Sequence, residues 1–323
     1  MRIDGLLLVD KPEGLTSLDV VREIKSRFSI RKAGHVGTLD PFATGLLPVA
    51  LNEGTKLIPF LPEEPKAYEG ALKVGEETRT DDLTGDIVRR KPWEDLTPER
   101  IEAVFRSFRG EIEQVPPMFS AVKVGGRPLY KIARKGLEIE RRPRVVVIHE
   151  LEVDHVALPI VLFRVSCSKG TYIRALARDI GQHLGCGAHL VSLRRTRSGP
   201  FTLEKALSIE RLRAMGQARE LLPHLIPLRE ALEDLPEMVG DERLIRKVRQ
   251  GQELRVGDLL PQPLLPPFEK GQKIRMTSPH LGLVAILETA LRADGIDPAD
   301  PGQSVLRPLR IFHSTGRSQA QGG

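Results

Sequence analysis

Residues 34–45, with the sequence GHVGTLDPFATG, place three glycines and one proline around a single carboxylate, Asp40. Glycine adopts backbone conformations that other residues avoid, and a proline disfavours the helical conformation for the residue before it. The segment is therefore expected to be a rigid bend from which the Asp40 side chain projects. Two interpretations fit such a bend. It is either an Asx-turn, in which the carboxylate caps its own backbone, or a loop that presents a reactive carboxylate.

The length of 323 residues predicts two domains, or one large α/β domain with an appendage. Hydrophobic residues make up 40% and charged residues 28%, as in an ordinary globular protein. No apolar run reaches the length of a membrane span, and the first run ends at Asp10, so neither a spanning helix nor a signal peptide is expected. Two cysteines without a CxxC pair indicate no disulfide framework and no zinc site. We expect a cytoplasmic protein.

The positive charge of the chain is concentrated in residues 123–145. The whole chain has a formal net charge of +6, and this segment holds eight basic and two acidic residues. A solvated helix face usually balances its charges, so the excess favours a polyanionic partner. Tyr130 and three glycines in the segment indicate an arm on which a nucleic-acid base could stack. The alternative is a charged surface hairpin without a partner.

Strands and helices are interspersed over the first two thirds of the chain, without the regular alternation of a doubly wound sheet. Segments with the apolar or alternating pattern of strands are residues 4–10, 68–74, 145–156 and 160–168. Ser17 and Thr97 are the expected caps of two helices with apolar residues at helical spacing, and Leu18 is expected on the buried face of the first. We predict an α/β (α+β) fold with a mixed, largely antiparallel sheet and flanking helices.

The pattern changes after a helical connector near residues 208–222. From about residue 236, short apolar runs are separated by Gly and Pro, which predicts a small β-rich domain. The expected organisation is a main domain over residues 1–235 with a basic insertion at about 115–145, a small domain over 236–315 and a disordered tail over 316–323.

A second candidate site lies at residues 167–174, where a strand is expected to end, turn at a glycine and enter a helix capped by Thr171. Arg174 and Arg178 are four residues apart on that helix. Like charges at this spacing repel, so an anion is expected beside them, either a phosphate or a carboxylate such as Asp179. The basic run at 194–197 is a further candidate for phosphate contact.

Several kinds of chemistry lack their motifs. The sequence contains no GxxxxGK[ST], GxGxxG, HExxH or GxSxG, and its eight histidines are not at metal-ligand spacing. A solitary carboxylate, an arginine at a helix start and a basic arm instead indicate chemistry on a nucleic acid without a cofactor.

Five short motifs follow one another in an order that resembles the TruB family of tRNA pseudouridine synthases. They are Lys11-Pro12, GHVGTLDP at 34–41, KAY at 66–68, GTYIR at 170–174 and LRR at 193–195. The resemblance covers residues 3–215 strongly, and the C-terminal part more loosely resembles the small PUA-type RNA-binding domain of that family. It implies a pseudouridine synthase catalytic domain over residues 1–235 and a PUA-like domain over 236–315.

The resemblance implies that Asp40 is the nucleophile that isomerises uridine 55 in the tRNA T-loop to pseudouridine. A carboxylate is ionised at neutral pH and attacks without a separate base. Arg174 would hold that carboxylate or a nearby phosphate, and Tyr68 would stack on the uracil after it has flipped out of the loop. Attack at the ribose C1′ and attack at the pyrimidine C6 both remain open.

Further RNA-binding residues are implied by the same motifs. His35 would fill the gap left by the flipped base, Lys11 and Pro12 would support the floor of the site, and Leu193 would line the pocket. Tyr172 belongs to the motif that ends at Arg174. For Pro12, Tyr172 and Leu193, plain packing is the alternative.

The basic segment resembles the thumb insertion with which stand-alone bacterial members grip the T-stem loop. A-form RNA is recognised through phosphates and shape, which suits basic side chains. The implied thumb residues are Lys123, Arg127, Lys131, Arg134, Arg141 and Arg142. The resemblance also implies a monomer that acts on the tRNA T-stem loop with no cofactor, no metal and no obligatory protein or guide-RNA partner, because the guide-dependent archaeal and eukaryotic relatives lack the insertion.

Two other functions remain compatible with these residues. One is a non-catalytic tRNA-binding or tRNA-folding protein that uses the same surface, and the other is a metal-dependent nuclease. Replacement of Asp40 and treatment with a chelator distinguish them from the synthase.

Overall fold

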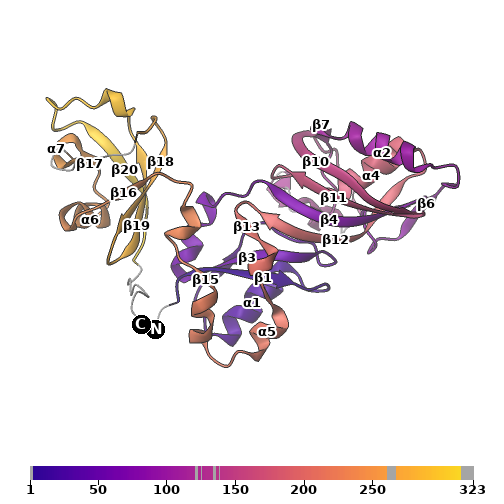
Figure 1. Cartoon of the computed structure of the whole chain (residues 1–323), viewed down its shortest axis with the longest axis horizontal. Helices are drawn as coiled ribbons and strands as arrows, with labels where there is room; N and C mark the ends of the chain where they lie inside the picture. Colours follow the sequence, from indigo (N-terminus) through magenta and orange to yellow (C-terminus); the bar gives the residue numbers. More distant parts are fainter. Residues whose placement is uncertain are drawn as a thin grey trace.

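The computed structural model describes residues 3–120, 123–124, 126–133, 136–137, 139–259 and 267–313. Arg134 and the expected tail at 316–323 lie outside these residues. Figure 1 shows a large sheet with helices at both ends and a smaller sheet set apart from it.

The large sheet is mixed and mainly antiparallel. In the described part of the chain it has 11 strands, of which eight form a continuous path. In spatial order these are β14 (Leu207–Ser208), β1 (Gly5–Lys11), β3 (Thr44–Leu51), β12 (Ala188–Ser198), β4 (Lys66–Val74), β11 (Ile160–Cys167), β10 (Arg144–Ala157) and β7 (Gly110–Gln114). The three strands off this path are β2 (Ala33–His35) on β3, β13 (Phe201–Thr202) on β12 and β15 (Leu225–Ile226) on β1. Only the β1–β14 and β3–β12 pairs are parallel within this sheet, which confirms the predicted mixed, largely antiparallel arrangement.

The two halves of the large sheet meet at the short β3–β12 pair, which spans only Arg194 opposite Thr44 and Arg195 opposite Gly45. One half packs against α1 (Ser17–Arg27) and α5 (Ile209–Ala214), and the other against α2 (Pro98–Ser107) and α4 (Ile173–Leu184) (Figure 1). The strands and helices share one apolar core. Burial of the apolar stripe of each helix in this core explains why the helices form where the spacing of apolar residues predicted them.

Short elements connect these units. The 3₁₀ helices are η1 (Asn52–Lys56), η2 (Ile58–Phe60), η3 (Leu203–Lys205), η4 (Ala218–His224), η5 (Glu230–Leu232) and η6 (Ala293–Gly295). Two hairpins stand outside the main sheets, β5 (Glu76–Thr78) with β6 (Ile87–Arg90), and β8 (Lys123–Val124) with β9 (Arg127–Pro128), the latter followed by α3 (Leu129–Ala133).

The C-terminal part has its own five-stranded sheet, which agrees with the predicted β-rich character of this region. Its order is β16 (Glu237–Val239), β18 (Lys273–Ser278), β19 (Gly282–Thr289), β20 (Ser304–Ile311) and β17 (Leu254–Arg255), flanked by α6 (Glu242–Arg249) and α7 (Val256–Leu259). Besides its own core, this sheet contributes Ile286 and Phe312 to an apolar cluster with Leu6 and Leu8 of β1. Residues from both parts of the chain therefore contribute to one apolar cluster. The division into domains at residue 235 remains a proposal.

Two details of α1 differ from the expectation. Thr16, not Ser17, is the N-cap, because Thr16 and Asp19 form a reciprocal capping box. Ser17 is instead buried in the first turn and hydrogen-bonds to the backbone of Leu39. Leu18 is 48% exposed, so the buried stripe is shifted and includes Val20 instead. The predicted cap at Thr97 is confirmed.

Candidate active site

Asp40 lies in the loop between β2 and β3, and this loop is fixed by backbone hydrogen bonds. The Ser17 hydroxyl bonds to both the N–H and the carbonyl of Leu39, and the Ala43 N–H donates to the Asp40 carbonyl at 3.1 Å. The Asp40 side chain is 38% exposed. Among the described residues, its carboxylate accepts hydrogen bonds from Arg174 and not from the loop backbone, which contradicts the Asx-turn interpretation.

Arg174 clamps the Asp40 carboxylate with two hydrogen bonds. Its Nε donates to Asp40 Oδ2 at 2.8 Å and its Nη2 to Asp40 Oδ1 at 3.2 Å. The arginine is 4% exposed and comes from the first turn of α4. The anion expected beside Arg174 is thus a carboxylate. A two-bonded guanidinium–carboxylate pair restricts both the position and the rotation of the carboxylate.

Arg174 is itself held from the other side. Its Nη1 donates to the Thr80 carbonyl at 3.0 Å and its Nη2 to the Phe119 carbonyl at 2.8 Å. Asp82, 4% exposed, lies 3.6 Å from Arg174 Nε. The Asp82 carboxylate also accepts hydrogen bonds from Thr80 and Thr84. Within TDDLTG, Asp82 has no sequence signal beyond a loop-ordering role, because its partner Arg174 lies on a distant segment.

Lys11 is fully buried beneath the loop. Its ammonium donates to the carbonyls of Pro12, Leu15 and Pro41 at 2.8, 2.7 and 3.2 Å. Burial lowers the pKa of Lys11 to about 8, although the nearby Asp40 charge acts in the opposite direction. All three N–H groups of the ammonium are thus used on backbone carbonyls around Asp40, so Lys11 supports the loop that carries the carboxylate.

Two expected pocket residues come from the central strands. Tyr68 on β4 is 8% exposed, and burial raises the pKa of its hydroxyl while the neighbouring Arg195 lowers it. Leu193 on β12 is 7% exposed and pairs with Gly70 in register, on the same face of the sheet as Tyr68. Both residues belong to the main apolar core cluster.

Arg195 does not lie where the expected phosphate contact of the basic run at 194–197 would need it. It is completely buried, and its guanidinium donates to the carbonyls of Leu46 and Gly37 at 2.8 Å each. It therefore supports the Asp40 loop from within the sheet and cannot contact a phosphate in this position. Arg194 is paired with Asp10 at 2.7 Å.

The remaining motif residues lie around this centre. His35 ends β2 and is half-buried, and its Nδ1 has no hydrogen-bond partner among the described residues. Tyr172 exchanges two backbone hydrogen bonds with the Gln114 side chain, at 3.1 and 2.8 Å. The expected Thr171 cap is wrong: Tyr172 is the N-cap of α4, and the Thr171 hydroxyl donates to the Ser168 carbonyl. Pro12 is half-buried.

The expected thumb residues are described only in part. Lys123, Arg127 and Lys131 lie in β8, β9 and α3, and their side chains are not described; Arg134 lies outside the described residues. Arg141 donates to the Pro116 carbonyl at 3.0 Å, and Arg142 is exposed.

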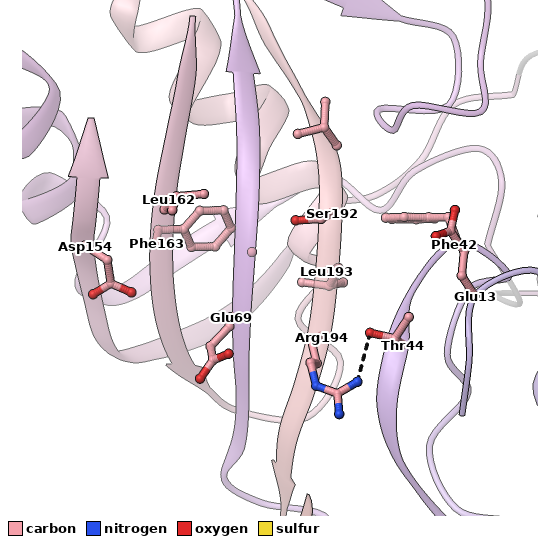
Figure 2. A pocket seen from close by; sticks show the side chains of 12 residues that line it. Glu13, Phe42, Thr44, Glu69, Asp154, Leu162, Phe163, Ser192, Leu193 and Arg194 are labelled. Carbon is pink, nitrogen blue, oxygen red and sulfur yellow. Dashed lines mark hydrogen bonds between the residues drawn. The ribbon is translucent and has the colours of Figure 1, made fainter. Parts of the chain in front are cut away.

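A cavity of about 420 Å³ opens where β12 and β3 diverge. Figure 2 shows Ser192, Leu193 and Arg194 along β12, with Phe42 on the other side of the opening and Arg194 hydrogen-bonded to Thr44. Leu193 lines this cavity, whereas Asp40, Tyr68 and Arg174 do not. The cavity thus borders the Asp40 site through Phe42 and Leu193.

Within the described ranges, no group of three or more His, Cys, Asp or Glu residues is arranged to hold a metal ion. No described helix is long and apolar enough to cross a membrane.

Comparison with known proteins adds family evidence to this geometry. Residues 25–173 match the model of the TruB family pseudouridylate synthase N-terminal domain, and residues 174–233 match that of the tRNA pseudouridylate synthase B C-terminal domain. The chain is 49% identical over 249 residues to tRNA pseudouridine synthase B of Geobacter sulfurreducens, covering 77% of this chain and 82% of the relative. It is 44% identical over 313 residues to tRNA pseudouridine synthase B of Syntrophus aciditrophicus, covering 96% and 99%.

Solved structures with the same fold include a Cbf5-Nop10-Gar1 complex, with a TM-score of 0.71, 29% identity, and coverage of 96% of this chain and 85% of the other. An H/ACA RNP bound to a substrate RNA containing 2'-deoxyuridine gives a TM-score of 0.70 and 27% identity, with coverage of 95% and 84%. The fold, the ordered motifs and relatives aligned over nearly their whole length agree: the chain belongs to the TruB family of tRNA pseudouridine synthases.

Proposed function

We propose that this chain isomerises uridine 55 in the tRNA T-loop to pseudouridine, with Asp40 as the nucleophile. The observation that carries the proposal is the half-exposed Asp40 carboxylate, held by two hydrogen bonds from the buried Arg174. A carboxylate with a fixed position and an accessible oxygen is suited to attack a bound nucleoside. Asp40 attacks the nucleoside at C1′ or at C6, the bond between the ribose C1′ and the uracil N1 breaks, and the base rejoins C1′ through C5 as the carboxylate is released. C5 loses its proton and N1 gains one, so the product is an isomer of the substrate.

The clamp also determines which side of the carboxylate reacts. Arg174 engages one lone pair on each Asp40 oxygen from within the protein, and solvent reaches the remaining surface. The positive charge of the guanidinium compensates the negative charge of the carboxylate when no substrate is bound. A nucleoside therefore approaches from the exposed side, where the lone pairs are free to attack.

Tyr68 and Leu193 are the proposed walls for the uracil. Extrusion of a stacked base from the T-loop costs a few kcal/mol, and stacking on an aromatic ring returns about 1–3 kcal/mol. Both residues lie on one face of neighbouring strands. His35 at the edge of the loop is the proposed residue that occupies the place of the flipped base.

Substrate and partners follow from the same proposal. We propose the T-stem loop as the bound RNA, gripped by the basic segment at 123–145, and an enzyme that works in the cytoplasm as a monomer without a guide RNA or protein partner. The high positive charge of this segment supports RNA as the bound partner.

The test is a map of pseudouridine in an unmodified T-arm transcript incubated with the purified protein alone. We expect modification at position 55 only, unaffected by a chelator, and none with Asp40→Asn, which keeps the size and planar shape of the side chain but replaces one acceptor oxygen with an NH2 donor. Binding of the transcript by the Asp40→Asn protein should persist. Substantial turnover by this variant would remove Asp40 as the nucleophile.

The remaining alternatives give different results in the same experiment. A tRNA-binding protein without activity leaves the transcript unmodified while binding it. A metal-dependent nuclease cleaves the transcript, and its activity stops when a chelator is added.

A further inference from the structure

Arg178 lies one helical turn beyond Arg174 on α4, and its contacts are different. Its Nη1 lies 3.3 Å from Asp81 Oδ2, and its Nη2 donates to the Val115 carbonyl at 3.2 Å. Its Nε donates to Asp179 on the same helix at 2.9 Å. All three charged side chains are mostly buried, with 16–19% exposure. A buried arginine with partners on three chain segments holds those segments together.

The segments that Arg178 joins to α4 are the two that orient Arg174. Asp81 lies between Thr80, whose carbonyl accepts from Arg174, and Asp82, whose carboxylate lies beside the Arg174 Nε. Val115 begins the stretch that leads to Phe119, whose carbonyl also accepts from Arg174. Arg178 thus does not touch Asp40, but it fixes the backbone on which the Arg174 clamp depends.

We propose that Arg178 and Asp81 form a positioning pair for the isomerisation, which orients the Asp40 carboxylate through Arg174. This inference rests on the proposed function. The backbone of Asp81 supports it, because its φ of 62° lies in the left-handed region, where residues other than glycine are uncommon. The loop keeps this conformation while the Asp81 carbonyl accepts from the Leu190 N–H of β12 and its side chain meets Arg178.

The charge state of Asp81 makes the pair sensitive to pH. Burial raises the pKa of Asp81 to about 6; Arg178 and Arg174 lower it, and Asp179 and Asp82 raise it. Above about pH 6 the carboxylate is ionised and pairs with Arg178. Below that pH it becomes protonated and the charge-assisted contact weakens. The rate of isomerisation should therefore fall below about pH 6 through this pair.

The test compares single-turnover rates and T-arm affinity for Asp81→Asn, Arg178→Gln and the double variant, in the full chain at neutral pH and through the acid range. We expect each single variant to react about tenfold more slowly with transcript affinity within about twofold of wild type. The double variant should be no slower than the slower single variant, because both changes release the same loop. Asp81→Asn should lack the loss of rate below about pH 6. Glu23→Gln, which breaks the surface pair with Arg213, is the matched control and should behave as wild type.

The outcomes separate this inference from the proposed function. If Asp40→Asn retains activity in the same assay, the proposed function fails. If Asp40→Asn is inactive while Asp81→Asn and Arg178→Gln react at the wild-type rate with the wild-type pH profile, the positioning role is wrong. The positioning role would also be wrong if the rate losses of the two single variants multiplied in the double variant, or if the affinity for the transcript fell as much as the rate. The pH profile of the wild-type protein tests the pair without any variant, since a flat profile through pH 6 contradicts it.

Discussion

Asp40 and Arg174 are 134 positions apart in the sequence, yet they form a two-bonded ion pair with distances of 2.8 and 3.2 Å. Asp40 lies in a loop that leads into β3, and Arg174 begins α4, so each half of the large sheet supplies one partner. The pair therefore crosses the point where β3 and β12 diverge, and the geometry of the site depends on both halves.

Arg174→Lys should lower the rate of pseudouridine formation at least about a hundredfold, with little change in transcript affinity, because a lysine keeps the charge but cannot make two parallel hydrogen bonds. Single-turnover kinetics on a T-arm transcript measure this. Arg213→Lys is the matched control, since Arg213 also binds a carboxylate, Glu23, with two hydrogen bonds of 2.6 and 3.0 Å. Equal rates for the two variants would contradict a specific role of the Arg174 fork.

Gly45→Ala should destabilise the fold by about 2–4 kcal/mol. Gly45 has a φ of +98°, and an added Cβ would lie 2.3 Å from the Arg195 carbonyl oxygen and 2.8 Å from its backbone nitrogen. Urea unfolding followed by circular dichroism measures the change. Gly251→Ala is the control, because Gly251 has a φ of +78° but open space around its Cβ, so only the backbone cost of about 1 kcal/mol applies. Similar losses for both variants would show that the contact with Arg195 is not the cause.

Lys11 should make stability depend on pH in a defined direction. Its pKa is about 8 in the folded protein and 10.5 when unperturbed, so between these values the unfolded chain holds the proton and the folded chain does not. Stability contributed by this group therefore rises with pH from about 8 to 10.5. The free energy of unfolding, measured in urea across this range for the wild type and Lys11→Met, should rise more steeply for the wild type. Parallel curves would rule out titration of Lys11.

Arg142→Gln should weaken transcript binding and reduce the slope of log affinity against log salt by about 0.9, the value for loss of one phosphate contact. Arg142 is exposed in the basic segment, so its loss leaves the core intact. Binding titrations at several salt concentrations measure the slope. Arg142→Lys keeps the charge and should retain the slope, and an unchanged slope in Arg142→Gln would exclude a phosphate contact at this residue.

Local patterns predicted four strands of the large sheet, β1, β4, β10 and β11, and the helices α1, α2 and α4, but not β3 and β12. The Thr97 cap was predicted because it depends on spacing within one segment. The family resemblance identified Asp40 and Arg174 as site residues but left Arg174 either on the carboxylate or on a phosphate. The structure resolves this choice because it depends on a contact between distant segments.

Other features could not be read from local sequence. Arg195 belongs to a basic run that suggests a surface, yet it is the largest fully buried side chain, because it fills the space beneath the Asp40 loop and donates to two carbonyls there. Asp81 and Asp82 are adjacent in one turn, but each pairs with a different arginine of α4. Thr171 is not the cap because its hydroxyl donates to the preceding turn at Ser168. Each case depends on partners far away in the chain or on the exact path of a turn.

The apolar cluster that Ile286 and Phe312 share with Leu6 and Leu8 has a consequence for any attempt to shorten this protein. β1 pairs with β3, β14 and β15 in the large sheet, and its Leu6 and Leu8 belong to the same apolar cluster as residues of the C-terminal part. A chain cut near residue 235 would expose that apolar surface to water and lose the hydrogen bonds from Lys56 to the Ile311 carbonyl and from the His313 N–H to Glu53. A truncated protein that binds tRNA poorly would thus report damage to the large sheet as well as loss of an RNA-binding surface. Point substitutions on the solvent side of the small sheet separate the two effects, because they leave the shared apolar face in place.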